Sequence, residues 1–130
     1  MRFLVAYNGS KEAKAALALA RGYAKLFHAK IIVMTSMEGG AGEKADEVGK
    51  AEYELNWARN FLLAEGIECE VQSFARGLLP GEDIVRYVEE NGVDQVYVGI
   101  EKKSKTRKLF MGSTAQYVIL KAPCPVICVK

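Results

Sequence analysis

The chain has 130 residues, half of them apolar, and a formal net charge of +2. This length fits one domain over residues 1–130, and the small net charge argues against nucleic acid as the partner. No apolar run approaches the ~20 residues that a membrane-spanning helix needs, and the N-terminus becomes polar too early for a signal peptide. We therefore expect a cytoplasmic protein that neither enters nor crosses a membrane.

Short apolar segments alternate along the chain with segments whose apolar residues recur at helical spacing. The predicted strands cover residues 3–7, 30–35, 67–74, 96–98 and 125–129. The predicted helices cover residues 13–27, 48–62, 84–88 and 115–121. Residues 38–49 are rich in glycine and charge and are expected to begin as a loop, and the alternating pattern of residues 67–74 predicts a strand near a sheet edge.

Several residues are predicted to start or stop these helices. Ser10 is placed to cap the first helix, and Gly66 to stop the second. Asn91 and Gly92 close the third. The resulting order, βαβαβαβαβ, predicts an α/β fold with a doubly wound, five-stranded parallel sheet covered by helices on both faces. Ligands of such folds bind beyond the carboxyl ends of the strands, where the winding direction reverses.

The segment from Gly99 to Thr114 has the features of a phosphate-binding loop. A buried strand ends at Gly99, five Lys or Arg residues follow between positions 102 and 108, and Gly112-Ser113-Thr114 opens a helix. Glycine allows backbone to approach a ligand closely, and the first turn of a helix presents unpaired N–H groups to an anion. The alternatives are a glycine that merely ends a strand, a solvated lysine loop, and Ser113 or Thr114 as simple helix caps.

Other polar residues favour structural roles. Asn8 is placed to hold the turn after the first strand through its side chain, or to reach a ligand. His28 is expected to be structural, and Trp57 and Phe61, one helical turn apart, are expected to pack together or at a partner surface. Solubilising or helix-capping roles are expected for three acidic residues near loops: Glu82, Asp83 and Glu101.

The sequence indicates no catalytic set and no metal site. Cys69, Cys124 and Cys128 lack the spacing of metal ligands and are predicted to be buried thiols in a reducing compartment. No nucleophile, base and acidic metal site occur together as phosphoryl transfer requires. We therefore predict no enzyme. Slow hydrolysis is left open for an anionic nucleotide, the ligand that the features of the Gly99–Thr114 segment suggest.

The chain resembles the universal stress proteins over essentially its whole length. Residues 3–10 are similar to the opening strand and turn of that family, residues 91–99 to its approach to the nucleotide loop, and residues 122–129 to its closing strand. Nucleotide-binding members carry Gly, two residues, Gly, nine residues and then Gly-Ser or Gly-Thr. Here Gly99 and Gly112-Ser113 match the first and last positions, with the loop length preserved.

Three positions depart from the pattern of the nucleotide-binding relatives. Lys102 replaces the second glycine, Asn8 stands where Asp is usual, and Ser36 stands where a small apolar residue commonly sits beside the adenine. The side chain of Lys102 either blocks the approach of phosphate or binds it with its ammonium group. Some relatives have a Ser and a Lys in this loop, and Ser104 and Lys108 of this chain resemble them.

The resemblance implies an adenine nucleotide, ATP with or without magnesium, in a homodimer paired through the last strand and acting in stress regulation. The residues that would bind it are Ala6, Tyr7, Asn8, Ser36, Val98, Gly99, Lys102, Lys103, Gly112, Ser113 and Thr114. The main alternative is an interaction module of the same fold that no longer binds nucleotide. A nucleotide-processing enzyme and a nucleic-acid-binding protein are two further alternatives.

Overall fold

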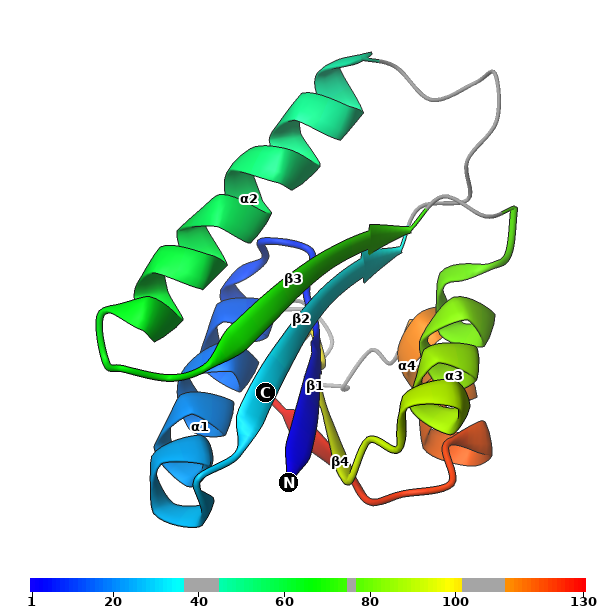
Figure 1. The fold of residues 1–130 in the computed structure, drawn as a ribbon. Helices are drawn as coiled ribbons and strands as arrows, with labels where there is room; N and C mark the ends of the chain where they lie inside the picture. The colour runs from blue at the N-terminus through cyan, green and yellow to red at the C-terminus, as the bar shows by residue number, and fades with distance from the viewer. Residues whose placement is uncertain (37–44, 75–76, 102–111) are drawn as a thin grey trace.

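The computed structural model describes residues 1–36, 45–74, 77–101 and 112–130, in which strands and helices alternate along the chain (Figure 1). The strands are β1 (Arg2–Ala6), β2 (Lys30–Ser36), β3 (Cys69–Phe74), β4 (Gln95–Gly99) and β5 (Val126–Val129). The helices are α1 (Lys11–Phe27), α2 (Ala45–Leu63), α3 (Pro80–Asn91) and α4 (Ser113–Lys121). No helix within these ranges is both long and apolar enough to cross a bilayer.

The five strands form one parallel sheet in the order β3-β2-β1-β4-β5. This arrangement confirms the predicted α/β class and the doubly wound, five-stranded parallel sheet. β1 and β4 are neighbours at the centre, with Ala6 opposite Val98, so the winding direction reverses between them. β3, predicted to lie near an edge, is an edge strand, and β5 forms the other edge.

The sheet separates two apolar clusters, each covered by a pair of helices (Figure 1). α1 and α2 cover one face, where Leu17 and Leu62 are fully buried against Val33. α3 and α4 cover the other, where Val88 and Val118 pack with Leu4. Strands buried on both faces explain the apolar runs in the sequence.

The predicted signals for helix ends are borne out at several positions. Ser10 caps α1 by accepting a hydrogen bond from the Ala13 N–H, at 3.1 Å. His28 ends that helix in the left-handed conformation at φ 55°, a structural role, and Gly92 ends α3 similarly at φ 60°.

The expected packing of Trp57 against Phe61 is also confirmed, because their rings stack with centroids 5.3 Å apart.

Some predicted boundaries were wrong for identifiable reasons. α2 begins at Ala45, inside the stretch expected to be a loop, because Asp46 and Glu47 in its first turn complement the helix dipole. β3 begins two residues late, because the Ile67 N–H bonds back to the Leu62 carbonyl and finishes the end of α2.

The three cysteines are less buried than predicted. Cys69 and Cys124 are half-buried, Cys128 is exposed, and all three are free thiols. All lie on or beside the two edge strands, where one side of the sheet is open, and this explains the incorrect prediction. Partial burial still raises the pKa of the Cys69 and Cys124 thiols, which disfavours the reactive thiolate.

Candidate functional site

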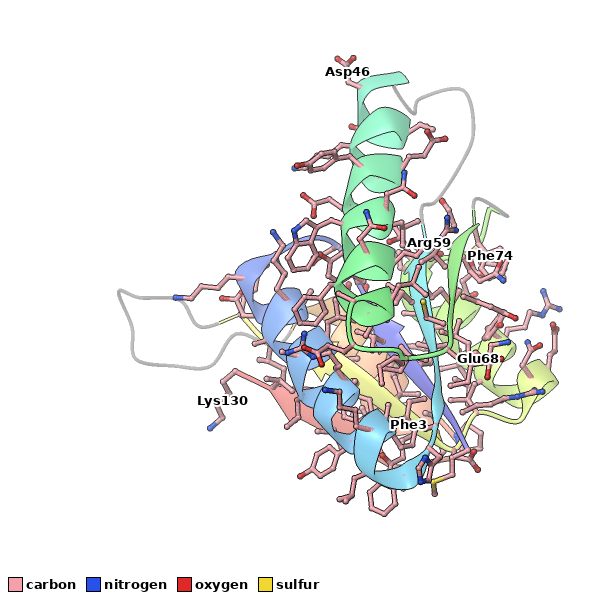
Figure 2. The ribbon with its side chains drawn as sticks, turned by 60° about the vertical axis from the view of Figure 1, so that its left-hand side comes forward. Phe3, Asp46, Arg59, Glu68, Phe74 and Lys130 are labelled. Carbon is pink, nitrogen blue, oxygen red and sulfur yellow. The ribbon has the colours of Figure 1, made fainter. Side chains whose placement is uncertain are left out.

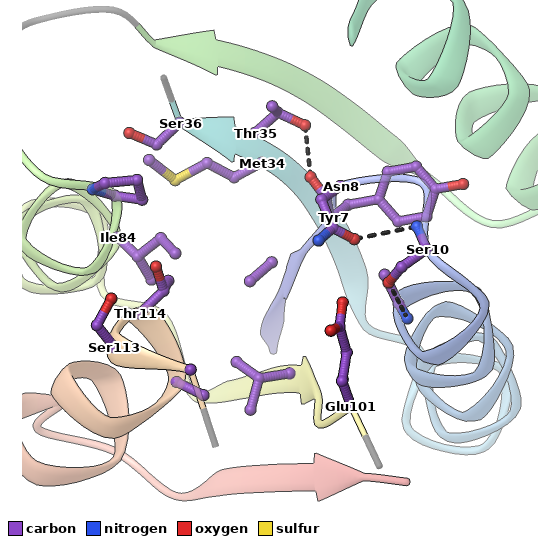
Figure 3. Close-up of a pocket in the computed structure, with 17 residues that line it drawn as sticks. Tyr7, Asn8, Ser10, Met34, Thr35, Ser36, Ile84, Glu101, Ser113 and Thr114 are labelled. Carbon is purple, nitrogen blue, oxygen red and sulfur yellow. Dashed lines mark hydrogen bonds between the residues drawn. The ribbon is translucent and has the colours of Figure 1, made fainter. Parts of the chain in front are cut away.

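A cavity of about 380 Å³ opens at the carboxyl ends of β1, β2 and β4, where the winding reverses (Figure 3). The starts of α1, α3 and α4 complete its walls. Its lining consists of Ala6, Tyr7, Asn8, Ser10, Ala13, Met34, Thr35, Ser36, Pro80, Ile84, Val98, Gly99, Glu101, Gly112, Ser113, Thr114 and Ala115. Segments far apart in sequence therefore meet at one concave site, as ligand sites of open α/β sheets do.

Most of the predicted site residues lie in this one cavity. Its lining includes Ala6, Tyr7, Asn8, Ser36, Val98, Gly99, Gly112, Ser113 and Thr114. Lys102 and Lys103 fall outside the described residues. Sequence reasoning missed the walls supplied by Met34, Pro80 and Ile84, because no motif marks an aliphatic side chain as part of a site.

The cavity has an apolar end and a polar end. The apolar end has an aliphatic surface, to which β2 contributes Met34 and the start of α3 contributes Pro80 and Ile84 (Figure 3). The polar end is the N-terminus of α4, where Ser113 and Thr114 lie. A flat apolar group suits the former, and an anionic group suits the latter.

Gly112, not Ser113 or Thr114, occupies the capping position of α4, with φ −63° and ψ 162°. Ser113 and Thr114 are the first two residues inside the helix, so neither occupies the N-cap position of the alternative in which they are simple helix caps. The first four N–H groups of a helix have no partner within it. Together with the helix dipole, they make this end of the cavity attractive to an anion.

Gly99 is required by the packing of α1. A Cβ at this position would lie 2.5 Å from the carbonyl carbon of Glu12 and 2.7 Å from the nitrogen of Ala13. Any side chain would therefore displace the first turn of α1. The close approach made possible by this glycine is that of another backbone segment, and it brings Gly99 and Ala13 into the same cavity wall.

The turn after β1 is fixed by its own side chains. The Asn8 Oδ1 accepts a hydrogen bond from the Ser10 N–H at 3.0 Å, which confirms the predicted turn-holding role of Asn8. Gly9 adopts φ 78°, and a Cβ there would collide with the Glu54 carboxyl group. This turn places Asn8 and Ser10 at the cavity rim (Figure 3).

Tyr7 connects the cavity to α2. Its ring is 3 % exposed, and its hydroxyl lies 3.5 Å from the Glu54 carboxylate, which in turn lies 4.0 Å from the Lys14 ammonium. Burial, followed by the charge and hydrogen bonding of Glu54, raises the pKa of Tyr7. Tyr7 therefore stays neutral at physiological pH and helps to attach α2 to the cavity wall.

A second hollow, of about 290 Å³, adjoins the first and shares Asn8, Thr35 and Ser36 with it. α2 supplies its remaining lining residues, among them Lys50 and Glu54. A cationic and an anionic side chain thus lie beyond the rim of the main cavity, on the side of β2.

Hydroxyl groups at the end of β2 donate to fixed acceptors. The Thr35 hydroxyl donates to the Tyr7 carbonyl, and the Ser36 hydroxyl donates to Oδ2 of Asp83, each at 2.6 Å. Asp83 is 0 % exposed, so the solubilising role expected for it is wrong. It lies in the first turn of α3, where the helix dipole favours a carboxylate.

Glu101 is a further residue that the sequence did not indicate as part of the site. It follows β4 and lines the cavity, where its side chain reaches toward the turn after β1 (Figure 3). Within the described ranges no three His, Cys, Asp or Glu side chains gather as metal ligands.

Comparison with known proteins identifies relatives of this chain. The model of the universal stress protein family matches residues 1–130. A universal stress protein from Archaeoglobus fulgidus has a solved structure with a TM-score of 0.92 and 37% identity, covering 100% of this chain and 98% of that one. Another structure, of the universal stress protein from the same organism in complex with dAMP, has a TM-score of 0.84 and 33% identity over 100% and 98% of the two chains. A curated universal stress protein from Thermus aquaticus is 29% identical over 98% of this chain and 96% of its own length.

Proposed function

Because this chain belongs to the universal stress protein family, we propose that its main cavity binds an adenine nucleotide, with ATP as the expected ligand. The observation that carries the proposal is the meeting of an aliphatic slot and the N-terminus of α4 in one cavity of about 380 Å³. A nucleotide has the same two parts, a flat base and an anionic tail. In this proposal the protein binds and responds to the nucleotide, as a stress-linked regulator in the cytoplasm.

The base is assigned to the slot between β2 and α3, against Met34 and Ile84. The ribose is assigned to the rim, near Asn8 and Glu101, whose side-chain oxygens accept hydrogen bonds from hydroxyl groups. The phosphates are assigned to the first turn of α4, beside Gly112 and Ser113. Lys102 and Lys103, which precede this helix in the sequence, would supply positive charge.

The relative solved with dAMP supports this assignment, because it is 33% identical and aligns over the whole of this chain. Its ligand carries an adenine base and one phosphate. Extension of the phosphate chain to three groups in this protein rests on the N-terminus of α4, which lines the cavity, and on the density of Lys and Arg between positions 102 and 108.

Isothermal titration calorimetry with ATP, AMP and adenosine tests the proposal. We expect ATP and AMP to bind and adenosine to bind more weakly, since it lacks the anion that α4 attracts. Repeating the ATP titration with and without magnesium shows whether a metal ion contributes. Absence of binding at millimolar ATP and AMP, in protein shown by native mass spectrometry to carry no bound ligand, would contradict the proposal.

We also propose that the protein is a homodimer paired through β5. β5 is an edge strand of the sheet in the single chain, and its unpaired side offers backbone groups to a second strand. Pairing of two β5 strands about a two-fold axis would satisfy them.

A further inference from the structure

The protein fixes the direction in which the Ser36 hydroxyl donates its hydrogen bond. A hydroxyl has one proton to donate and two lone pairs to accept with. The proton of Ser36 goes to Oδ2 of Asp83 over 2.6 Å. What Ser36 retains for a ligand in the cavity is therefore its acceptor capacity alone.

Asp83 is well placed to hold this direction. Its side chain is 0 % exposed, it sits in the first turn of α3, and its own N–H bonds to the Leu79 carbonyl at 3.0 Å. Every buried side-chain N or O atom in the described part of the chain has a partner. Rotating the Ser36 proton toward the cavity would remove a hydrogen bond from a buried carboxyl group, which is costly.

Thr35 repeats the pattern one residue earlier. Its hydroxyl donates to the Tyr7 carbonyl at 2.6 Å, and both residues line the cavity. The Thr35 hydroxyl turns toward the end of β1, whereas the Ser36 hydroxyl lies on the side of the aliphatic wall formed by Met34, Pro80 and Ile84 (Figure 3). The edge of a base that lies against this wall beside Ser36 therefore meets lone pairs and not a donor.

We infer that Ser36, oriented by Asp83, selects a base that carries an amino group at this edge. This inference rests on the proposed function and assigns its base specificity. An exocyclic amine donates a hydrogen bond to Ser36, whereas a purine without the amine leaves the Ser36 lone pairs unpaired in a desolvated slot. Sites that hydrogen-bond a substrate N–H reject analogues that lack it for this reason.

The experiment compares AMP with purine riboside 5′-monophosphate, which differs from AMP only by loss of the exocyclic amine. Calorimetry on the wild-type protein is expected to give about tenfold tighter binding of AMP, the effect of one hydrogen bond. In Ser36→Ala the preference should fall to about twofold or less, through weaker binding of AMP and tighter binding of the analogue, which no longer buries an unpaired hydroxyl. Ser73→Ala is the matched control, since Ser73 is exposed on the neighbouring strand opposite Thr35, outside the cavity, and should keep the wild-type preference.

Asp83→Asn tests the direction of the hydrogen bond. An amide N–H turned toward Ser36 releases the hydroxyl proton for the ligand, so the preference for AMP should shrink in this variant as well. Circular dichroism shows whether the variant is folded. If it is not, the loss of the AMP preference in Ser36→Ala tests the inference.

The outcomes separate this inference from the proposed function. A wild-type protein that binds neither nucleotide overturns both. A wild-type protein that binds AMP while Ser36→Ala keeps the full preference over the analogue overturns the inference alone, as does equal wild-type binding of the two nucleotides.

Discussion

Gly112 offers the most direct test of where the phosphates bind. A Cβ at this position meets no atom of the described residues within 4 Å, and φ −63° is accessible to any residue. Gly112→Val should therefore fold, with a loss of about 1 kcal/mol because valine is a poor helix cap. Its side chain would occupy the cavity at the start of α4, so we expect ATP affinity to fall at least about tenfold.

Calorimetry with ATP measures this loss, and Gly22→Val is the control. Gly22 also has open space around it but lies on an exposed part of α1, outside the cavity. Wild-type ATP affinity in a folded Gly112→Val protein would show that phosphate does not bind beside this residue.

Gly99→Ala is expected to act on stability first. The new methyl group would lie 2.5 to 2.7 Å from backbone atoms of Glu12 and Ala13, so the start of α1 must shift. Overpacking of this kind costs about 1–3 kcal/mol. Urea unfolding measures the cost, and Gly22→Ala should instead gain up to about 1 kcal/mol from helix propensity. Equal stability of the two variants would contradict the role given to Gly99.

At the level of single residues, the sequence predicted which backbone positions surround the site better than it predicted what each residue does. Asn8 and Gly99 were placed because parallel strands end at a common edge. The sequence did not predict the burial of Asp83. This burial depends on the Ser36 hydroxyl, which β2 places opposite the start of α3. Gly99 was expected to approach a ligand, and the neighbour that requires it is α1, which sequence spacing does not reveal.

The attachment of α2 to α1 depends on aromatic rings with cations over them. Trp57 stacks on Phe61, the Lys14 ammonium lies 4.6 Å from the Trp57 ring centre, and the Arg21 guanidinium carbon lies 4.0 Å from that of Phe61. These contacts lie between the two helices on one face of the sheet, and Figure 2 shows α2 extending beyond that sheet toward Asp46. α2 therefore relies on its C-terminal half for anchoring.

Trp57→Ala should destabilise the protein by about 2 kcal/mol, because a half-buried indole loses its packing and its cation contact. Urea unfolding followed by circular dichroism measures the change. Tyr53→Ala is the control on the same helix, since Tyr53 is 69 % exposed and should cost less than about 0.5 kcal/mol. A cost at Trp57 no larger than at Tyr53 would show that the ring cluster does not hold α2.

Element order and element ends differed in how well the sequence predicted them. Apolar runs and helical spacing specified βαβαβαβαβ because each element buries one consistent face. The start of α2 was missed because Gly49 and the surrounding charges resemble a loop, while the acidic first turn at Asp46 and Glu47 stabilises a helix.

The pH dependence of stability is a property of the whole molecule to which Tyr97 contributes. Its ring is 0 % exposed against Phe3, and burial, together with the charge of Tyr23, raises the pKa of Tyr97 to about 12. The folded state therefore holds this proton more tightly than the unfolded state does. The stabilisation is complete below the ordinary tyrosine pKa near 10 and is lost as the pH rises toward 12.

We expect Tyr97→Phe to be less stable than wild type at pH 8, where it lacks the hydrogen bond from the hydroxyl to Gln95. Between pH 10 and 12 the wild-type protein should lose stability on the order of 1–2 kcal/mol relative to the variant, once solvent screening is allowed for. Urea unfolding across this range measures the gap. A constant gap would contradict the raised pKa.

Pairing through β5 predicts the assembly state. Analytical ultracentrifugation at micromolar concentration should show a dimer, and Cys128→Lys should shift it toward monomer, because lysine on an edge strand opposes strand pairing. Cys128 is exposed in the single chain, so this change costs little stability. Ser73→Lys on the opposite edge strand is the control and should stay dimeric. A monomeric wild-type protein would contradict the proposal.

The cavity draws its walls from both sides of the winding reversal, with β2 and α3 on one side and β4 and α4 on the other. A molecule seated there touches two halves of the chain that also meet through β1 and β4, through the packing of α1 on β4, and through the contact between α3 and α4. Transient opening of either half has to expel the occupant first. Saturation of the cavity with nucleotide should therefore slow amide hydrogen exchange in β2 and in α4 together, by a factor that grows with the concentration of free nucleotide.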